Sequence, residues 1–481
     1  MPDHDMPRLV MVVPNWRDLD NAYADRDLRG VEEELKQRLN DRLMTTLTDG
    51  ERALVSDFRV DYLASNGTVP VGLTIEPAAL RRRLVCGIVM TGGESAAELL
   101  AVNIRRAYGD EAAIGADLTV RAAAVVDIDR FWTHWCPGEA PYGLFGRRGA
   151  ALRAMGATAQ HLANAGLPVP GPSSLRVNLV SVDTGLPMSL IRPIGTFPGW
   201  NIEVTDASGT TVRRPGDPLT GHGAMVASNA LACAPGVTVL DCPVIPDGIM
   251  NLDLFLGVLV AAMHRVTDAV ELLKGDDIQE GRPPRSWVVC NAWGVFDPSR
   301  ESSSVPYSSD PNHPLTTAFR DLAQLDVDIV FAAGNCGQFC PNNRCGPDFI
   351  GPGRSINGAN AMPEALTVGA VRSDGLWLGY SSQGPGITGL AHDKPDLCAP
   401  SQFENDDDAG SNTGTSAACG LAAGAVALLR TRWPSATVDP ATLRAVLRDT
   451  AVQPYGPQGW QERTGHGVIN VAAAAAALNA I

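Results

Sequence analysis

The sequence predicts an α/β protein built on a parallel sheet. From Leu175 onward, short apolar runs alternate with longer helical patterns, and glycine-rich or polar turns separate them. The apolar runs are nearly continuous, which is typical of strands buried on both faces. Strands joined through helices lie parallel, with helices on both faces of the sheet. We expect strands over 177–182, 237–240, 287–290, 328–333 and 365–371, and helices over 225–232, 250–273, 315–325 and 421–429.

The chain of 481 residues is long enough for two or three domains. We predict a smaller α/β domain over residues 1–147 and a larger α/β domain over 148–481. The first domain is expected to contain strands at 9–13, 58–63, 69–75, 84–90 and 118–126, and helices within 18–47 and 94–108. A helix over 152–165 then precedes the stiff Pro/Gly run 166–172.

Composition and charge exclude several classes of function. The net charge of -15 argues against general nucleic-acid binding, which needs a basic surface. The N-terminus is polar and acidic, unlike a secretory signal. The most apolar helical window, 252–263, contains Asp253 and is too short to span a bilayer. We therefore expect a cytoplasmic chain without membrane association.

Most of the ten cysteines lie in apolar runs, where a thiol packs as a small hydrophobe. Cys336, Cys340 and Cys345 are the exception, because they cluster in one loop. Three thiolates could bind zinc with a fourth ligand, or two of them could form a disulfide. Their spacing matches no familiar zinc-finger pattern, so we favour a loop-stiffening role and assign no metal.

The segment 413–420 places a hydroxyl at the start of a helix. Small and polar residues surround Thr415 and Ser416, and the Ala-rich run 421–429 follows. Ser416 is therefore expected in the first helical turn, beside unpaired N–H groups and the positive end of the helix dipole. This environment stabilises an oxyanion formed when the hydroxyl attacks a carbonyl.

Three more polar residues are predicted at the carboxyl ends of strands or the start of a helix. Asp183 ends the strand 177–182, His222 begins a small-residue helix between two glycines, and Asn335 follows the strand 328–333. Chemistry in parallel α/β sheets gathers at this edge. Asp127 and Asp129 also end an apolar run, so they compete with Asp183 for the role of the acidic residue. We reject them because they lack the Thr-Gly pair that follows Asp183 and because they lie before the Pro/Gly run 166–172.

These motifs, in this order, resemble the subtilisin-like (subtilase) serine proteases. The matching blocks are Val182-Asp183-Thr184-Gly185, Gly221-His222-Gly223, Ala333-Gly334-Asn335 and Gly414-Thr415-Ser416-Ala417. The resemblance covers roughly residues 150–481 and implies a subtilisin-like three-layer fold. It further implies a serine endopeptidase that acts on protein or peptide substrates.

The resemblance implies a role for each matching residue. Ser416 would be the nucleophile, His222 the general base and Asp183 the residue that orients His222. Asn335 would donate to the oxyanion. Ala292, Trp293, Gly294 and Gly334 would bind substrate.

Two positions depart from the family pattern. Trp293 stands where the family has a smaller residue, which predicts narrower or reshaped subsites and restricted specificity. Gly420 stands where the family usually has proline, which is expected to loosen the first helical turn.

Other functional interpretations stay open. The acidic loop 404–408 is expected to be solvated, although a structural calcium ion could bind there. No other cofactor is expected. Residues 1–147 would act as a prodomain or as a regulatory module that binds a partner. The rival hypothesis is a catalytically silent binding or scaffold protein with the same fold.

Overall fold

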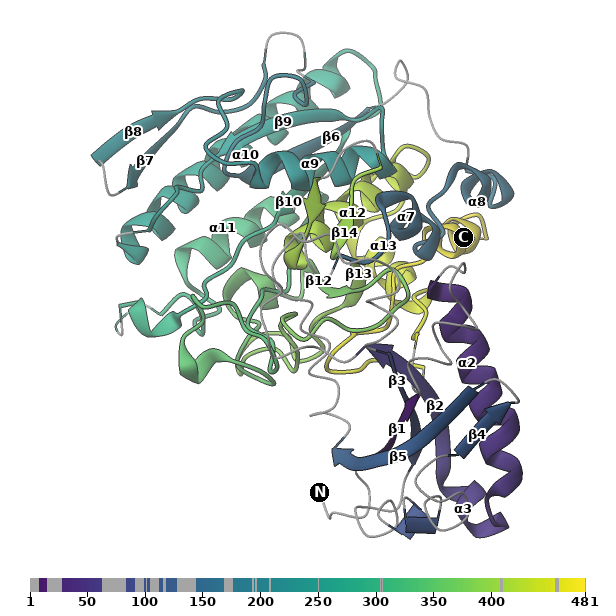
Figure 1. Ribbon diagram of the computed structural model, residues 1–481. Helices are drawn as coiled ribbons and strands as arrows, with labels where there is room; N and C mark the ends of the chain where they lie inside the picture. The colour runs from purple at the N-terminus through teal and green to yellow at the C-terminus, as the bar shows by residue number, and fades with distance from the viewer. Residues whose placement is uncertain are drawn as a thin grey trace. The chain divides into compact units, whose positions relative to one another are not determined.

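The chain divides into two compact units, Met1–His134 and Trp135–Ile481, which we describe separately (Figure 1). The computed structural model describes residues 8–14, 28–62, 84–90, 99–100, 102–103, 112–115, 118–127, 144–167, 176–192, 194, 197–206, 209–249, 251–302, 304, 306–406, 410–454 and 458–480.

The described part of the first unit is an antiparallel sheet with helices. Its strands lie in the order β2-β3-β1-β5-β4. Their bounds are Arg8–Pro14 (β1), Val55–Tyr62 (β2), Leu84–Met90 (β3), Ala112–Gly115 (β4) and Leu118–Asp127 (β5). Helix α2 (Leu28–Leu43) buries Leu35 and Leu39, and the short α3 (Asp49–Leu54) begins with a capping box on Thr48. The strand expected at 69–75 and most of the helix expected at 94–108 lie outside the described residues.

A six-stranded parallel sheet forms the centre of the second unit, as the sequence predicts. Its strand order is β13-β12-β11-β10-β6-β9. The strands are β6 (Val177–Asp183), β9 (Thr238–Pro243), β10 (Ser286–Asn291), β11 (Val327–Ala332), β12 (Ala365–Val371) and β13 (Leu397–Pro400). Every residue of β6, β10, β11, β12 and β13 is buried, which explains their uninterrupted apolar character.

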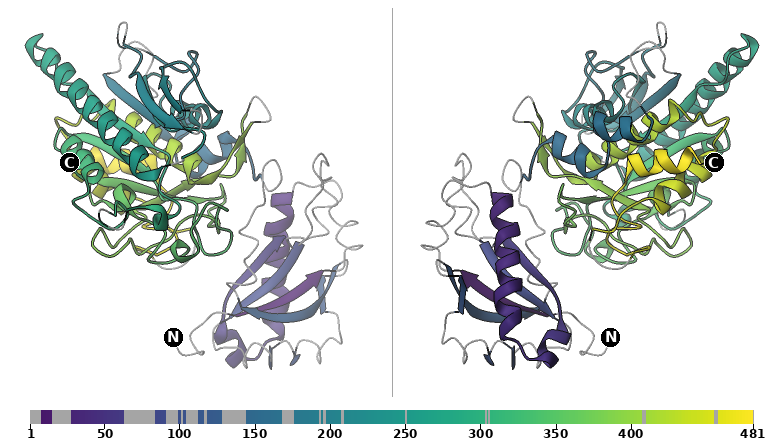
Figure 2. Two further views of the ribbon diagram at one scale, coloured as in Figure 1. Left: turned by 90° about the vertical axis from the view of Figure 1, so that its left-hand side faces the viewer. Right: turned by 90° about the vertical axis from the view of Figure 1, so that its right-hand side faces the viewer.

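Helices cover both faces of this sheet and make three layers (Figures 1 and 2). Helices α9 (His222–Cys233), α12 (Gly414–Arg430), α13 (Pro440–Asp449) and α14 (Val471–Leu478) share one hydrophobic core with the sheet. On the opposite face, α10 (Leu252–Gln279) and α11 (Pro314–Ala323) form the second core. Figure 2 shows α10 extending past the rest of the unit.

The expected single helix over 152–165 is wrong, because the structure has two. They are α7 (Arg148–Ala154) and α8 (Ala159–Asn164). Gly156 separates them with a φ of +60°, a left-handed conformation that glycine adopts without strain. A side chain at this position would also meet Asn470 Oδ1 at 2.8 Å.

Smaller elements complete the unit. They are the hairpins β7 (Ile202–Asp206) with β8 (Gly209–Arg213) and β14 (Phe403–Glu404) with β15 (Ser411–Asn412), and the 3-10 turns Pro298–Arg300, Pro347–Phe349 and Gly358–Ala361. Within the described parts of both units, every helix is too short or too polar to cross a bilayer.

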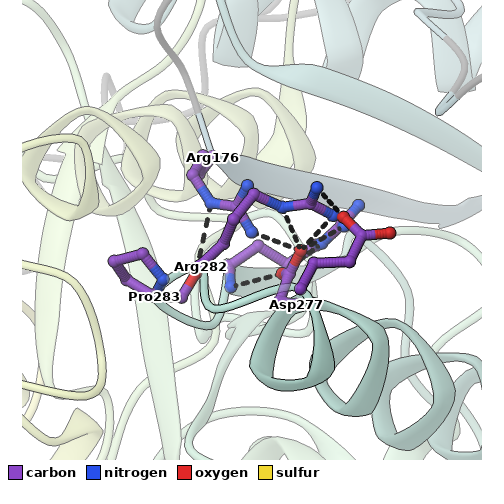
Figure 3. A network of polar contacts seen from close by, with 6 residues as sticks. Arg176, Asp277, Arg282 and Pro283 are labelled. Carbon is purple, nitrogen blue, oxygen red and sulfur yellow. Dashed lines mark hydrogen bonds and ion pairs between the residues drawn. The ribbon is translucent and has the colours of Figure 1, made fainter.

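A cluster of charges ties the end of α10 to the amino end of the sheet (Figure 3). Asp277 is fully buried and lies in ion pairs with Arg176, Arg282 and Arg285. Arg176 and Arg285 directly precede β6 and β10, so one carboxylate joins two strands to the helix. Although burial raises the pKa of Asp277, hydrogen bonds from Arg285 and Arg176 lower it more, and the pKa lies well below its usual range.

Candidate active site

Asp183 lies at the carboxyl end of β6, on the face of the sheet that α9 and α12 cover. Val177 and Leu179 belong to the core under these helices, whereas Val180 and Val182 belong to the opposite core. Because side chains alternate along a strand, residue 183 falls on the same face as 177 and 179. Its carboxylate is 2% exposed and therefore needs polar partners.

Those partners are the backbone of Thr184 and the ring of His222. Asp183 Oδ1 accepts a hydrogen bond from Thr184 N at 2.7 Å and lies 2.7 Å from His222 Nδ1. The Thr184 hydroxyl also accepts from Gly223 N at 3.2 Å, which fastens the start of α9 to the end of β6. Gly223 permits this contact, because a Cβ there would lie 2.6 Å from Gly185 O.

The pKa of His222 is raised above its ordinary value. Burial lowers this pKa, but the negative charge of Asp183 and the hydrogen bond to it raise the pKa by more in total. The positive charge of Arg344 acts in the opposite direction and lowers it. The imidazole is thus prepared to accept a proton, with Nδ1 held by the carboxylate.

Helices α9 and α12 pack against each other through glycines on α12. A Cβ on Gly420 would lie 2.5 Å from Val226 O, and one on Gly424 would lie 2.3 Å from Ala230 O. From the first contact to the second, each helix advances by four residues, or about one helical turn. The two helices therefore run side by side in the same direction. From this register we infer that Ser416 and His222, each one turn before the first contact, lie on facing sides of the two helices.

Gly420 therefore has a structural purpose that the sequence did not reveal. The expected loosening of the helix at this residue is not observed, since α12 runs unbroken from Gly414 to Arg430. A side chain at 420 would instead push α9 away from α12. The glycine allows the close approach of the two helices whose first turns hold His222 and Ser416.

Ser416 lies in the first turn of α12, as predicted, and is 7% exposed. Its hydroxyl donates a hydrogen bond to Ala292 O at 3.2 Å. Within the described residues, no hydrogen bond joins Ser416 to His222. Such bonds are often long or misaligned before substrate binds, so this geometry is compatible with proton transfer between them.

Asn335 is oriented by Thr415, whose role sequence reasoning missed. Asn335 Oδ1 accepts hydrogen bonds from Thr415 N and Thr415 Oγ1, both at 2.9 Å. The Thr415 hydroxyl also accepts from Gly334 N at 3.2 Å. Within the described residues, the Asn335 NH₂ group makes no hydrogen bond, so it remains available as a donor. The adjacent Thr415-Ser416 pair was visible in the sequence, but the contact across 80 residues was not.

A small hollow borders Asn335 and contains two of the four residues expected to bind substrate. Gly294 and Gly334 line it, together with Val295, Phe296, Ala333, Asn335, Cys336, Ser355, Asn357 and Asn360. The half-buried ring of Trp293 packs instead against the core, with ring centroids 5.2 Å from Phe331 and 6.2 Å from Phe319. The carbonyl of Trp293 accepts from Asn360 Nδ2 at 2.9 Å. Substrate binding by Ala292, Trp293, Gly294 and Gly334 stays a prediction.

The cysteine loop that follows Asn335 is held by disulfide chemistry. Cys336 and Cys345 form a disulfide, and Cys340 is disulfide-bonded as well. The zinc alternative is therefore wrong, because these sulfurs are not available as thiolates. The predicted stiffening of the loop agrees with this linkage. The expected cytoplasmic location stays a prediction.

The acidic loop makes local contacts with α7. Glu404 pairs with Arg147, and Asp406 Oδ1 accepts from Gly149 N at 3.1 Å. Residues 407–409 lie outside the described part of the chain, so calcium binding in this loop stays a prediction. Elsewhere among the described residues, no three His, Cys, Asp or Glu side chains are grouped to hold a metal ion.

Solved structures with a similar fold include several proteases. A lanthipeptide protease is 19% identical, with a TM-score of 0.44, over 69% of this chain and 95% of that one. MycP1 from Mycobacterium smegmatis is 20% identical, with a TM-score of 0.42, over 71% of this chain and 87% of that one. Sphericase is 20% identical, with a TM-score of 0.42, over 62% of this chain and 92% of that one. None of the curated proteins matches this chain.

A family model described as "Subtilase family" matches residues 182–467, which is more than half of the chain. The match begins at Val182 in β6 and ends at Gly467, so it includes Asp183, His222, Asn335 and Ser416. The parallel six-stranded sheet with helices on both faces agrees with it. The chain belongs to the subtilase family and is a subtilisin-like serine endopeptidase.

Proposed function

We propose that the protein hydrolyses peptide bonds through an acyl-enzyme formed on Ser416. The observation that carries this proposal is the 2.7 Å contact between Asp183 Oδ1 and His222 Nδ1, beside the helix whose first turn holds Ser416. His222 takes the Ser416 proton as the hydroxyl oxygen attacks the substrate carbonyl, then passes it to the leaving amine. Water, activated by the same imidazole, releases the acyl group.

Asn335 and the start of α12 supply the oxyanion site in this proposal. The negative charge that develops on the carbonyl oxygen would be bound by the Asn335 NH₂ group and by the Ser416 backbone N–H. Two features support it: the hydrogen bonds from Thr415 that occupy Asn335 Oδ1, and the positive end of the α12 dipole. Asp183 holds the imidazole in the required tautomer and stabilises its charged form.

Labelling with a fluorophosphonate probe tests the nucleophile directly. The full-length protein is expected to be labelled at Ser416, and Ser416→Ala is expected to lose the label. Ser309→Ala is the matched control, because Ser309 is exposed and its hydroxyl has no role in this mechanism. Absence of labelling and of peptide cleavage in a folded protein would favour the silent scaffold instead.

We also propose that the N-terminal unit restrains the peptidase. A separate unit in front of a complete set of catalytic residues motivates this. The truncated chain should begin at residue 135, where the second unit begins. A start at residue 148 would remove Phe145, whose N donates to Gln402 O at 2.7 Å and whose ring lies under the Arg372 guanidinium. Faster cleavage by the truncated chain than by the full-length protein is expected. Equal rates for two folded proteins would exclude inhibition by residues 1–134.

A further inference from the structure

The loop between Asn335 and Gly346 is fastened at both ends beside the proposed oxyanion site. The Cys336–Cys345 disulfide closes it directly after Asn335. Asn342 N donates to Asn335 O at 2.8 Å, and Gly346 N donates to Phe296 O at 3.0 Å. The loop is thus attached both to Asn335 and to the segment that lines the hollow.

This loop presents one cation, Arg344. Its guanidinium carbon lies 4.0 Å from the centre of the Phe296 ring, in a cation–π arrangement. The Arg344 backbone N and Nε both donate to Asn342 Oδ1 at 3.0 Å, which orients the side chain. The guanidinium is therefore held in place by contacts that leave most of its five N–H donors uncommitted.

No carboxylate neutralises this cation among the described residues. Asp297, which directly follows Phe296 in the chain, accepts instead from the Ser299 hydroxyl at 2.6 Å. Burial lowers the pKa of Arg344, and no opposing effect of a nearby acid accompanies it.

Arg344 lies close to the residues that are proposed to take part in the reaction. Phe296, on which it stacks, lines the same hollow as Asn335 and Gly294. Its charge also reaches His222, whose pKa it lowers. The other polar residues of the hollow, Ser355, Asn357 and Asn360, carry no charge.

We propose that Arg344 determines specificity by selecting substrates with a glutamate or aspartate at the residue whose carbonyl is attacked. The side chain of that residue is attached to the Cα atom, which is bonded to the attacked carbonyl carbon. Because the proposed oxyanion donor Asn335 lines the hollow, a side chain next to this carbonyl can reach the hollow. A carboxylate there meets the guanidinium and replaces water on its free donors. The inference rests on the proposed function and names the substrate class of the same site.

The test compares two peptide series that differ only in charge. Full-length protein is given matched fluorogenic peptides with Glu or Gln at the cleaved position, at pH 8 and low salt. Because a charged hydrogen bond at a partly exposed site is being measured, kcat/KM is expected to favour Glu by about tenfold. Arg344→Gln should reduce this ratio to about one, and Arg344→Lys should retain part of it.

Arg432→Gln is the matched control. Arg432 also lies over an aromatic ring, 5.4 Å from the Trp433 ring centre, but beyond the far end of α12 from Ser416. The Glu-to-Gln ratio is expected to stay at the wild-type value in this variant. A loss of the ratio in both variants would overturn the assignment to Arg344.

The pH profile provides a second measurement that a merely structural arginine would not change. Removing the positive charge of Arg344 should raise the pKa of His222, so the acid limb of kcat/KM on the Gln peptide should move to higher pH.

If Ser416 is labelled by the fluorophosphonate and wild-type protein cleaves Gln peptides as fast as Glu peptides, the inference is wrong although the proposed function stands. If Ser416 is neither labelled nor active, both fail together.

Discussion

A buried carboxylate lies at each end of β6, Asp277 of α10 at the amino end and Asp183 at the carboxyl end, and the two have different charged partners. At the amino end, Arg176 precedes the strand and pairs with Asp277, which also pairs with Arg282 and Arg285. At the carboxyl end, the one ionisable group paired with Asp183 in the described part of the chain is His222, at 2.7 Å. Asp277 is surrounded by three positive charges, whereas the partner of Asp183 is an imidazole whose pKa is raised above its ordinary value by the charge of Asp183 and the hydrogen bond to it, against the effect of burial.

The ion cluster at the amino end of β6 contributes to stability, whereas the pair at its carboxyl end is proposed to take part in the reaction. Three guanidinium groups keep Asp277 ionised at any ordinary pH, so the cluster joins α10 to β6 and β10 permanently (Figure 3). A single imidazole leaves Asp183 with a partner that can gain and lose a proton. Substitutions at the carboxyl end should therefore reduce activity, and those at the amino end should reduce stability.

The largest expected effect is loss of turnover in His222→Ala. Without the imidazole no group takes the Ser416 proton, and kcat/KM should fall to the background rate. The His222 side chain is 39% exposed, but its loss removes a partner of the buried Asp183 carboxylate, so the free energy of unfolding should fall by about 1–2 kcal/mol. Peptide hydrolysis and urea denaturation measure the two quantities. A large loss of stability with retained turnover would contradict the comparison.

Asn335→Ala should have the next largest effect. Loss of one oxyanion donor is expected to lower kcat by about 100- to 1000-fold, a magnitude already established in this family of proteases. KM should change little, because the donor acts mainly on the transition state. Steady-state kinetics on one peptide separate the two constants. If KM rises while kcat is unchanged, Asn335 binds the ground state instead.

Asp277→Asn should affect stability rather than activity. Removing the shared carboxylate leaves three guanidinium groups close together, and partial exposure of Arg176 and Arg282 limits the loss to about 2–3 kcal/mol. Because the native pKa of Asp277 is lowered, its stabilisation is present above about pH 4 and is lost as pH falls. The deficit of the variant should accordingly shrink in acid.

Urea denaturation across pH measures this effect, with Asp276→Asn as the control. Asp276 is the adjacent residue and lies outside the cluster. It should leave the free energy of unfolding nearly unchanged. Equal losses in the two variants would show that helix α10 itself, rather than the ion cluster, responds to the substitution.

Gly420→Ala should produce the smallest effect, on both quantities. The new methyl group would lie 2.5 Å from Val226 O, so α9 and α12 must move apart. Overpacking is partly offset by the better helix propensity of alanine, giving a net loss of about 1–2 kcal/mol. A reduced kcat should accompany it, because the first turns of these helices hold His222 and Ser416.

Gly257→Ala on α10 is the matched control for that substitution. A Cβ at residue 257 would have no atom within 4 Å, so the same change there should stabilise the protein slightly. Thermal denaturation distinguishes a loss at 420 from a gain at 257. If both substitutions stabilise the protein, the two helices are not held at the contact distance that Gly420 permits.

Several features could be predicted from the sequence because they depend on local patterns. Continuous apolar runs alternating with helical ones predict the parallel sheet, and the structure confirms it over β6, β10, β11 and β12. The position of Ser416 in a first helical turn follows from a polar turn before an Ala-rich run, and it too is confirmed. The order of the Asp, His, Asn and Ser blocks identified the family that the comparisons show.

Other features depend on distance in space, and no local pattern contains them. The interruption at Gly156 comes with a left-handed backbone, and a side chain there would meet Asn470, more than 300 residues later. The orientation of Asn335 depends on Thr415, 80 residues away. Gly420 is interpreted as a helix-weakening residue until its contact with Val226 is known.

The sequence alone determined the class of this protein, because alternating hydrophobicity and the chemistry of a few short blocks are written in consecutive residues. Tertiary structure alone decided how Asp183 meets His222, how α9 and α12 align, and where the disulfide-closed loop holds Arg344. The physical reason is that these arrangements arise from packing and hydrogen bonds between segments far apart in the chain. Their distances are set only when the sheet and its helices come together.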